Sequence, residues 1–72
     1  MPLVIMYDIP KNKNTLLVRI WRELQKLNAS KVVDSVWQLE DNEINLEILK
    51  NLRNLINQGG GDAKIMRVFE FD

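Results

Sequence analysis

The fold is decided by the stretch Leu3-Val4-Ile5-Met6-Tyr7-Asp8-Ile9-Pro10, an apolar run that leads straight into a carboxylate. Apolar residues at both alternating positions are typical of a central strand with neighbours on both sides. Pro10 ends this strand because it lacks an N–H donor. We therefore expect a strand over residues 2–8 with Asp8 at its mouth. Burying an ionised Asp at this position is costly unless it is paired or bound to a cation, which would make Asp8 a functional residue. The alternative is that Asp8 only forms a turn, because Asp is common in turns near Pro.

The pattern beyond this strand predicts an α+β domain. Apolar residues at helical spacing predict a first helix, with Asn12 or Asn14 as its cap and Asn28 as a left-handed end. Two short β segments follow, then a second helix capped by Asn42 or Asn45, and a last strand. The expected β segments are residues 30–34 and 35–40, the second helix opens at Asp41-Asn42 with its apolar stripe over residues 46–56, and the last strand covers residues 63–71. The order β-α-β-β-α-β predicts a single ferredoxin-like domain over residues 1–72, with an antiparallel four-stranded sheet and both helices on one face.

Two sequence features resemble binding motifs and are interpreted as structural. Gly59-Gly60-Gly61 follows a helix and precedes a strand, whereas phosphate-binding loops follow a strand and open a helix. We expect a flexible connection there. Trp21 and Trp37 lie within apolar stripes, so we expect both in the core rather than as stacking platforms.

The second face of the sheet predicts an interface. Both alternating sets of the last strand hold large apolar residues, with Ile65, Phe69 and Phe71 in one set and Met66 and Val68 in the other. Two helices cover only one face, and a large open apolar face usually marks an interface. We therefore expect a homodimer.

Composition excludes several kinds of chemistry. The 72 residues include no Cys and no His, which excludes a disulfide framework, a Cys/His zinc site and nucleophilic catalysis by Cys or a Ser–His pair. Any metal ion would have to be a hard cation bound by oxygen ligands. No apolar run approaches the ~20 residues that span a bilayer, so we expect no membrane partner and a cytoplasmic protein.

The charges balance overall but are not evenly spread. Ten basic and ten acidic residues give a formal net charge of zero. Within residues 11–31, however, Glu23 is the single acid among six bases, and residues 34–47 carry acids only. This pattern indicates a local basic surface on a neutral protein.

Three features in this order resemble the CRISPR-associated Cas-two family: the strand ending in Tyr7-Asp8, the basic helix, and Ser35-Val36-Trp37-Gln38-Leu39-Glu40. The resemblance implies a ferredoxin-like dimer of spacer acquisition that bridges the Cas-one integrase and binds RNA or DNA. It also implies a metal-dependent endonuclease that uses Mg²⁺ or Mn²⁺.

By this resemblance, Asp8 matches the acidic residue that binds the metal ion and is credited with catalysis. The residues expected to bind nucleic acid are Tyr7, Lys11, Lys13, Arg19, Arg22, Lys31 and Ser35. This chain departs from the family in its thinner basic run after Asp8, in its end at Asp72, and in Trp37, where Phe is usual.

Two alternatives stay open on the same residues. The Asp-Ile-Pro and Ser-Val-Trp stretches are also similar to a domain of PaaX-type transcriptional repressors, which implies a non-catalytic dimerisation or interaction module. The small fold is also similar to the VapD family, which implies a toxin-like ribonuclease.

Overall fold

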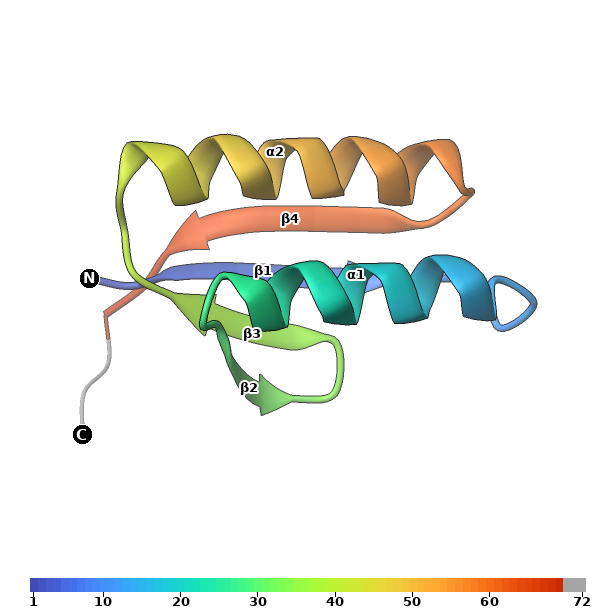
Figure 1. Cartoon of the computed structure of the whole chain (residues 1–72), viewed down its shortest axis with the longest axis horizontal. Coiled ribbons are helices and arrows are strands. Elements are labelled where there is room, and N and C mark those ends of the chain that lie inside the picture. The colour runs from blue at the N-terminus through green and yellow to red at the C-terminus, as the bar shows by residue number, and fades with distance from the viewer. Residues whose placement is uncertain (70–72) are drawn as a thin grey trace.

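The structure is a computed structural model, and it describes residues 1–69. Its elements are β1 (Leu3–Asp8), α1 (Asn14–Lys26), β2 (Ser30–Val33), β3 (Val36–Leu39), α2 (Glu43–Gln58) and β4 (Asp62–Arg67). This order confirms the predicted β-α-β-β-α-β arrangement, which is ferredoxin-like. Figure 1 shows both helices running in roughly the same direction as the long strands β1 and β4.

The sheet has the strand order β2-β3-β1-β4, and all its pairs are antiparallel. Ile5 pairs with Trp37 on one side and with Ile65 on the other, so these three residues share one face. That face packs against the helices, because Ile5 is fully buried together with Ile20 of α1 and Ile56 of α2. The core is therefore built from the odd-numbered positions of β1, β3 and β4.

Helix α1 begins without the predicted cap. Lys13 is the N-cap residue and no side chain caps it, so the prediction of Asn12 or Asn14 is wrong. A turn closed by the Lys13 N–H donating to the Pro10 carbonyl at 2.9 Å leads into the helix instead. Asn28 adopts a φ of 58° just beyond the other end, which confirms the left-handed termination.

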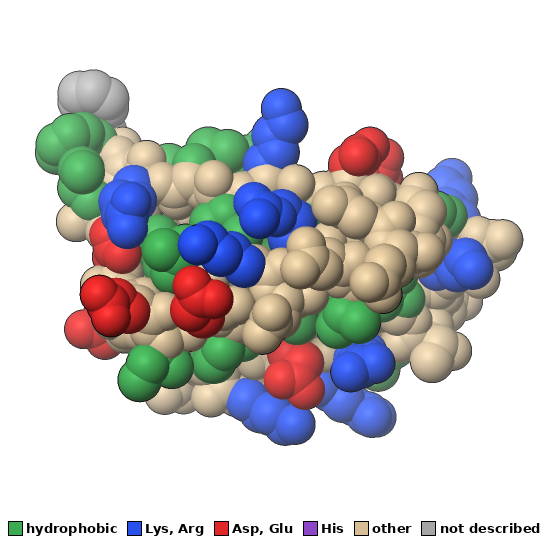
Figure 2. Space-filling view, turned by 90° about the horizontal axis from the view of Figure 1, so that it is seen from above, with side chains coloured by type: hydrophobic (Ala, Val, Ile, Leu, Met, Phe, Trp, Pro, Cys, Tyr) green, Lys and Arg blue, Asp and Glu red, His purple; other side chains and the backbone are tan. Residues whose placement is uncertain are grey.

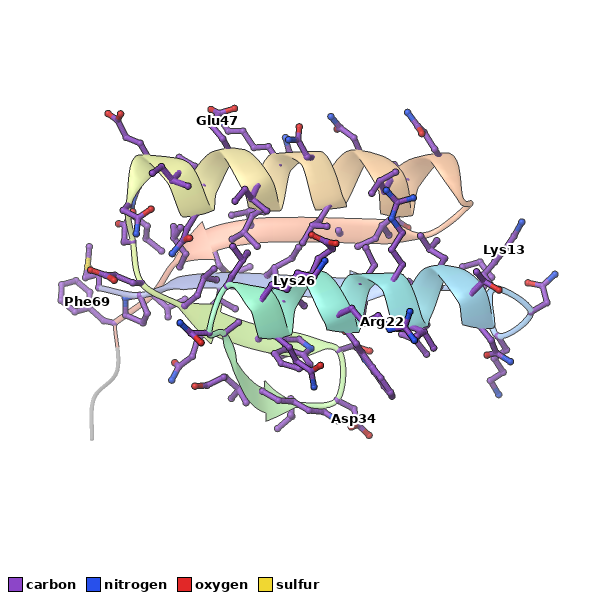
Figure 3. All side chains as sticks on the ribbon, viewed as in Figure 1. Lys13, Arg22, Lys26, Asp34, Glu47 and Phe69 are labelled. Carbon is purple, nitrogen blue, oxygen red and sulfur yellow. The ribbon has the colours of Figure 1, made fainter. Side chains whose placement is uncertain are left out.

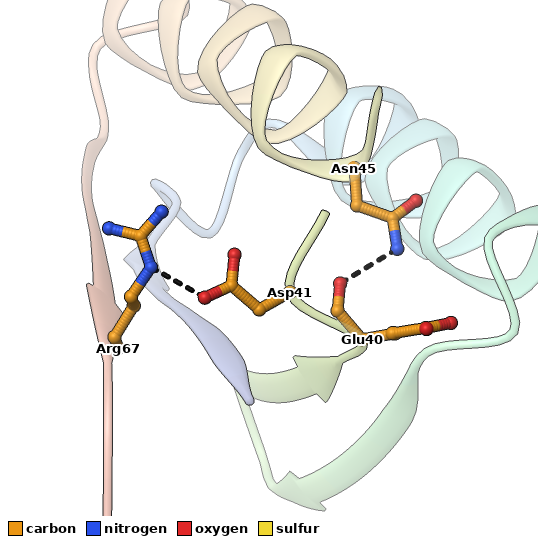
Figure 4. Close-up of polar contacts among 4 residues, drawn as sticks. All are labelled: Glu40, Asp41, Asn45 and Arg67. Atoms are coloured by element: carbon orange, nitrogen blue, oxygen red, sulfur yellow. Dashed lines mark hydrogen bonds and ion pairs between the residues drawn. The ribbon is translucent and has the colours of Figure 1, made fainter. Parts of the chain in front are cut away.

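Helix α2 begins as the sequence predicts. The Asn42 side chain accepts a hydrogen bond of 2.8 Å from the Asn45 backbone N–H, and Glu43 lies in the first turn. A carboxylate at this end of a helix is favourable for the helix dipole. Figure 4 shows two further contacts at this point: the Asn45 amide donates to the Glu40 carbonyl, and Arg67 of β4 pairs with Asp41. These bonds hold the β3–α2 connection against the sheet.

The glycine connection between α2 and β4 is shaped by close packing. Gly60 has a φ of +90°, which L side chains rarely adopt. A Cβ at Gly61 would collide with the Asp8 carbonyl oxygen, so the backbone of this loop lies directly against the end of β1. The glycines therefore allow a tight contact, which is a more specific role than the flexible connection that we expected.

The open face of the sheet is apolar at its centre and charged at one end. Val4 is buried, Met6 is exposed, and Met66 and Val36 are half-buried on this face. Asp8, Asp62 and Lys64 lie at the end of the face where β1 finishes. Strand β4 ends at Arg67, so the predicted extent of the last strand was too long, and Phe71 lies outside the described residues.

Candidate functional site

The exposed side of α1 carries the basic residues that the charge pattern predicted. We define the α1 basic face as Arg19, Arg22 and Lys26 of α1 together with Lys11 and Lys13, which precede the helix; all five residues are exposed. Figure 3 shows Lys13, Arg22 and Lys26 spread along the length of the helix. Arg19, Arg22 and Lys26 also line one shallow hollow with Asn14, Thr15, Val18 and Glu23. The helix therefore presents a row of cations to solvent from a rigid element.

The two arginines of this face form no ion pair with another described residue, although Glu23 lines the same hollow. Lys26 pairs with Glu23 at 3.3 Å, whereas Arg19 and Arg22 form no ion pair with any of residues 1–69. Acidic side chains gather elsewhere. In Figure 2, which looks onto the α2 side of the molecule, they lie mainly at the end where that helix begins, with Glu43 in its first turn. Within residues 1–69, the two guanidinium groups are therefore exposed and outside any ion pair.

A second polar site lies between α1 and the β2–β3 hairpin. We define the hairpin hollow by its lining residues Leu17, Trp21, Lys31, Asp34 and Ser35, and its volume is about 350 Å³. The Lys31 ammonium lies 5.6 Å from the Trp21 ring centroid and forms an ion pair of 2.8 Å with Asp34. Trp21 is 40% exposed, so the prediction that it lies in the core is wrong, whereas Trp37, at 6% exposed, confirms the prediction.

Tyr7 connects the hairpin hollow to the core. Its backbone N–H donates to the Ser35 carbonyl at 3.0 Å, and its hydroxyl accepts a hydrogen bond of 3.0 Å from the Trp37 indole. Burial raises the pKa of the Tyr7 hydroxyl, although the indoles of Trp37 and Trp21 and the charge of Lys31 act in the opposite direction. The hydroxyl is therefore protonated at neutral pH and retains a hydrogen to donate.

Asp8 lies apart from these residues, on the open face of the sheet. It pairs in register with Asp62 of β4, which places two carboxylates side by side. Like charges directly opposite each other are unfavourable unless a cation lies between them. Residues 1–69 bring together no group of three or more potential metal ligands, so two carboxylates alone are available here. The assignment of Mg²⁺ or Mn²⁺ and of catalysis to Asp8 stays a prediction.

The structure divides the predicted site residues into three groups. Lys31 and Ser35 line the hairpin hollow, and the Tyr7 N–H donates to the Ser35 carbonyl beside it. Lys11, Lys13, Arg19 and Arg22 belong to the α1 basic face, and Asp8 lies on the opposite face of the sheet. The sequence analysis counted Lys26 in the basic segment but left it out of the predicted binding residues, although it lies one turn beyond Arg22 on the same side of the helix. It also missed Trp21 and Asp34 as neighbours of Lys31, a proximity that depends on how the hairpin folds against α1.

Fold and surface together define a small ferredoxin-like domain with one basic helix. A comparison with protein families matches residues 17–72 to the family described as Protein ChrB, N-terminal. The match covers more than half of the chain, and the chain therefore belongs to this family. No curated protein matches the sequence. In the described part of the chain, no helix is long and apolar enough to cross a membrane.

This family assignment corrects the interpretation of the function. The resemblance to the CRISPR-associated Cas-two family is wrong, and with it the roles in spacer acquisition and as an endonuclease and the partnership with the Cas-one integrase. The match does not support the PaaX and VapD alternatives either, and a homodimer is not shown.

The residues that carried the mistaken resemblance have structural explanations. Tyr7 and Asp8 precede the matched residues, and the Tyr7 hydroxyl is occupied by the Trp37 indole. Ser35 has a φ of 65°, as the tight turn between β2 and β3 requires. The Tyr7 hydrogen bond and the Ser35 turn are therefore features of this fold, and the family match gives no support for reading the motifs as the Cas-two site.

Proposed function

We propose that this chain is a binding domain of a regulatory protein of chromate resistance, and that its α1 basic face contacts the phosphates of a nucleic acid. The family match supports the first part, because ChrB is a chromate-resistance regulatory protein. A regulator needs to bind its target rather than to transform it. The second part rests on the surface of α1.

The observation that carries the nucleic-acid contact is the pair Arg19 and Arg22. They lie one turn apart on the same helix, both are exposed, and neither has a carboxylate partner within residues 1–69. A guanidinium group binds a phosphate through two parallel hydrogen bonds and stays charged at all physiological pH values. Lys26 lies one turn further along the same face and extends the row of cations.

The rest of the molecule limits the strength of this contact. The formal net charge is zero, so no general positive field attracts a polyanion. Phosphate contacts also carry no information on base sequence. The chain is therefore expected to bind weakly, with a strong dependence on salt, and to position the protein on its target rather than to select a sequence by itself.

Fluorescence anisotropy with a labelled DNA duplex tests the proposal. The variant Arg19→Ala/Arg22→Ala is expected to bind at least about tenfold more weakly than wild type at low salt, because two phosphate contacts are lost. The matched control is Lys50→Ala/Lys64→Ala, which removes two exposed positive charges from α2 and β4. Equal binding by wild type and the arginine variant would refute the α1 contact. Equal weakening in both variants would show that the loss follows the net charge of the protein rather than a contact made by Arg19 and Arg22.

A promoter reporter tests the regulatory half separately. In cells whose chromate-resistance genes respond to this protein, the arginine variant is expected to alter reporter expression while the lysine control keeps the wild-type level. If the arginine variant loses DNA binding in vitro but leaves reporter expression unchanged, the regulatory role is refuted. The assignment of the α1 basic face as the DNA contact would still stand.

A further inference from the structure

The α1 basic face is bordered by two exposed apolar side chains of the same helix. Trp21 is 40% exposed and Val18 is 39% exposed. Residues three and four positions apart are neighbours on a helix surface, so Val18 lies between Trp21 and Arg22. Val18 and Arg22 line the shallow hollow of the basic face, whereas Trp21 lines the hairpin hollow. Contacts to phosphates alone would leave both apolar side chains in water.

The Trp21 ring is held on its inner side and loosely covered on its outer side. Burial raises the pKa of the Tyr7 hydroxyl, and a hydrogen bond from the Trp21 indole acts against this rise. On the outer side, the Lys31 ammonium lies 5.6 Å from the ring centroid and pairs with Asp34. The Asp34 side chain is 96% exposed, and an exposed ion pair contributes little stability because solvent screens both charges. A flat ring can therefore replace Lys31 over Trp21 at little cost.

We infer that this side of α1 binds an unpaired nucleic-acid strand, with a base stacked on Trp21, the sugar over Val18 and the phosphate at Arg22. The inference rests on the proposed function, since it takes Arg22 as a phosphate contact and adds the other parts of the same nucleotide. The sugar of a nucleotide lies between its base and its phosphate, as Val18 lies between Trp21 and Arg22. Proteins that bind single strands combine cations along the backbone with aromatic rings for the bases. A duplex keeps its bases stacked on one another and can use only the cations.

Binding of single strands is compared with binding of a duplex of the same length. The probes are fluorescein-labelled oligo-deoxythymidylate, alone and paired with oligo-deoxyadenylate, and oligo-uridylate as the RNA strand. A duplex has the denser charge, so electrostatic attraction alone favours the duplex. Wild type is nevertheless expected to bind at least one single strand more tightly, because only an unpaired base can stack on Trp21. The two strands show whether the surface prefers DNA or RNA.

Substitution of Trp21 tests the stacking contact. Trp21→Leu is expected to weaken binding of the single strand about fivefold or more, and to affect binding of the duplex far less. The dependence of strand binding on salt should keep its wild-type slope, since no charge is removed. Trp21→Phe retains an aromatic ring and should retain most of the binding, which separates loss of stacking from loss of the fold. The matched control is Phe69→Leu, because Phe69 is 76% exposed and lines neither hollow.

The two tryptophans provide a direct readout of the contact. The chain contains Trp21 and Trp37 only, so its ¹H–¹⁵N NMR spectrum has two indole signals. Oligo-deoxythymidylate should shift the Trp21 signal saturably and more strongly than the signal of the buried Trp37. Three results would overturn the inference: a duplex that binds as tightly as both single strands, a Trp21 signal that does not move, or undiminished strand binding by both Trp21 variants.

The inference and the proposed function can fail separately. If Arg19→Ala/Arg22→Ala weakens duplex binding while Trp21→Leu binds the single strand as wild type does, the phosphate contact stands and the stacked base is refuted. If the arginine variant binds the duplex as wild type does while Trp21→Leu loses the single strand, the proposed phosphate contact is refuted and the stacked base stands.

Discussion

The indole N–H of Trp37 donates a hydrogen bond of 3.0 Å to the hydroxyl of Tyr7, and both side chains are almost fully buried. The two residues lie on neighbouring strands, β3 and β1, and face the helices. A buried indole N–H is costly if it has no acceptor. This pair therefore explains why a tyrosine, rather than a phenylalanine, occupies an otherwise apolar strand.

The first prediction concerns the stability that this bond supplies. Tyr7→Phe keeps the ring but removes the acceptor, which leaves the Trp37 N–H buried and unpaired. The free energy of unfolding is expected to fall by about 1–3 kcal/mol. Urea unfolding of wild type, Tyr7→Phe, Trp37→Phe and the double variant forms a double-mutant cycle. Additive effects of the two substitutions would show that the hydrogen bond does not contribute to stability.

The second prediction is a loss of stability at alkaline pH. Burial raises the pKa of Tyr7 above its ordinary value of 10.0. A group with a higher pKa in the folded chain contributes its full stability below the unfolded pKa and loses it as the pH rises through the folded pKa.

The free energy of unfolding of wild type is therefore expected to decline above about pH 10. Tyr7→Phe lacks this component, so the difference in stability between the two proteins should shrink over that pH range. Lysines titrate in both proteins alike, and the comparison removes their effect. A difference that stays constant as the pH rises would contradict the proposed burial of the hydroxyl.

The third prediction concerns the start of α2. The Asn42 side chain satisfies the Asn45 N–H, so Asn42→Ala is expected to cost about 1 kcal/mol of stability. Asn54→Ala is the matched control, because Asn54 is exposed in the interior of the same helix and alanine is the better helix former there. Thermal unfolding should show a lower Tm for the first variant only. Equal melting of the two variants would exclude a capping role for Asn42.

The sequence predicted the order of the elements well, because periodicity and turn residues act locally. The apolar run of β1, the stripe of α2 with its Asn42 cap, and the left-handed Asn28 were all visible without a structure. The face on which each β1 side chain lies was not, since Val4 and Ile5 are equally apolar. The pairing of Ile5 with Trp37 and Ile65 determines which β1 side chains face the helices, and this register depends on contacts between residues distant in sequence.

The candidate sites were harder to predict for the same reason. Trp21 belongs to the apolar stripe of α1 by its spacing, yet it lies at the edge of the core, where Lys31 of β2 covers its ring. The function inferred from resemblance depended on Tyr7, Asp8 and Ser35, which in this fold lie in a buried hydrogen bond, at a strand end and in a tight turn. Short motifs of that kind recur wherever the fold requires them.

The salt dependence of DNA binding tests the central claim most directly, namely that Arg19 and Arg22 contact phosphates. The logarithm of the binding constant is measured against the logarithm of the salt concentration for wild type, Arg19→Ala/Arg22→Ala and Lys50→Ala/Lys64→Ala. Each duplex phosphate contact contributes about 0.9 to the magnitude of the slope, so the arginine variant should lose about 1.8. The lysine variant removes the same amount of charge and should keep the wild-type slope. An arginine variant with the wild-type slope, or a lysine variant with an equal loss, would contradict the account.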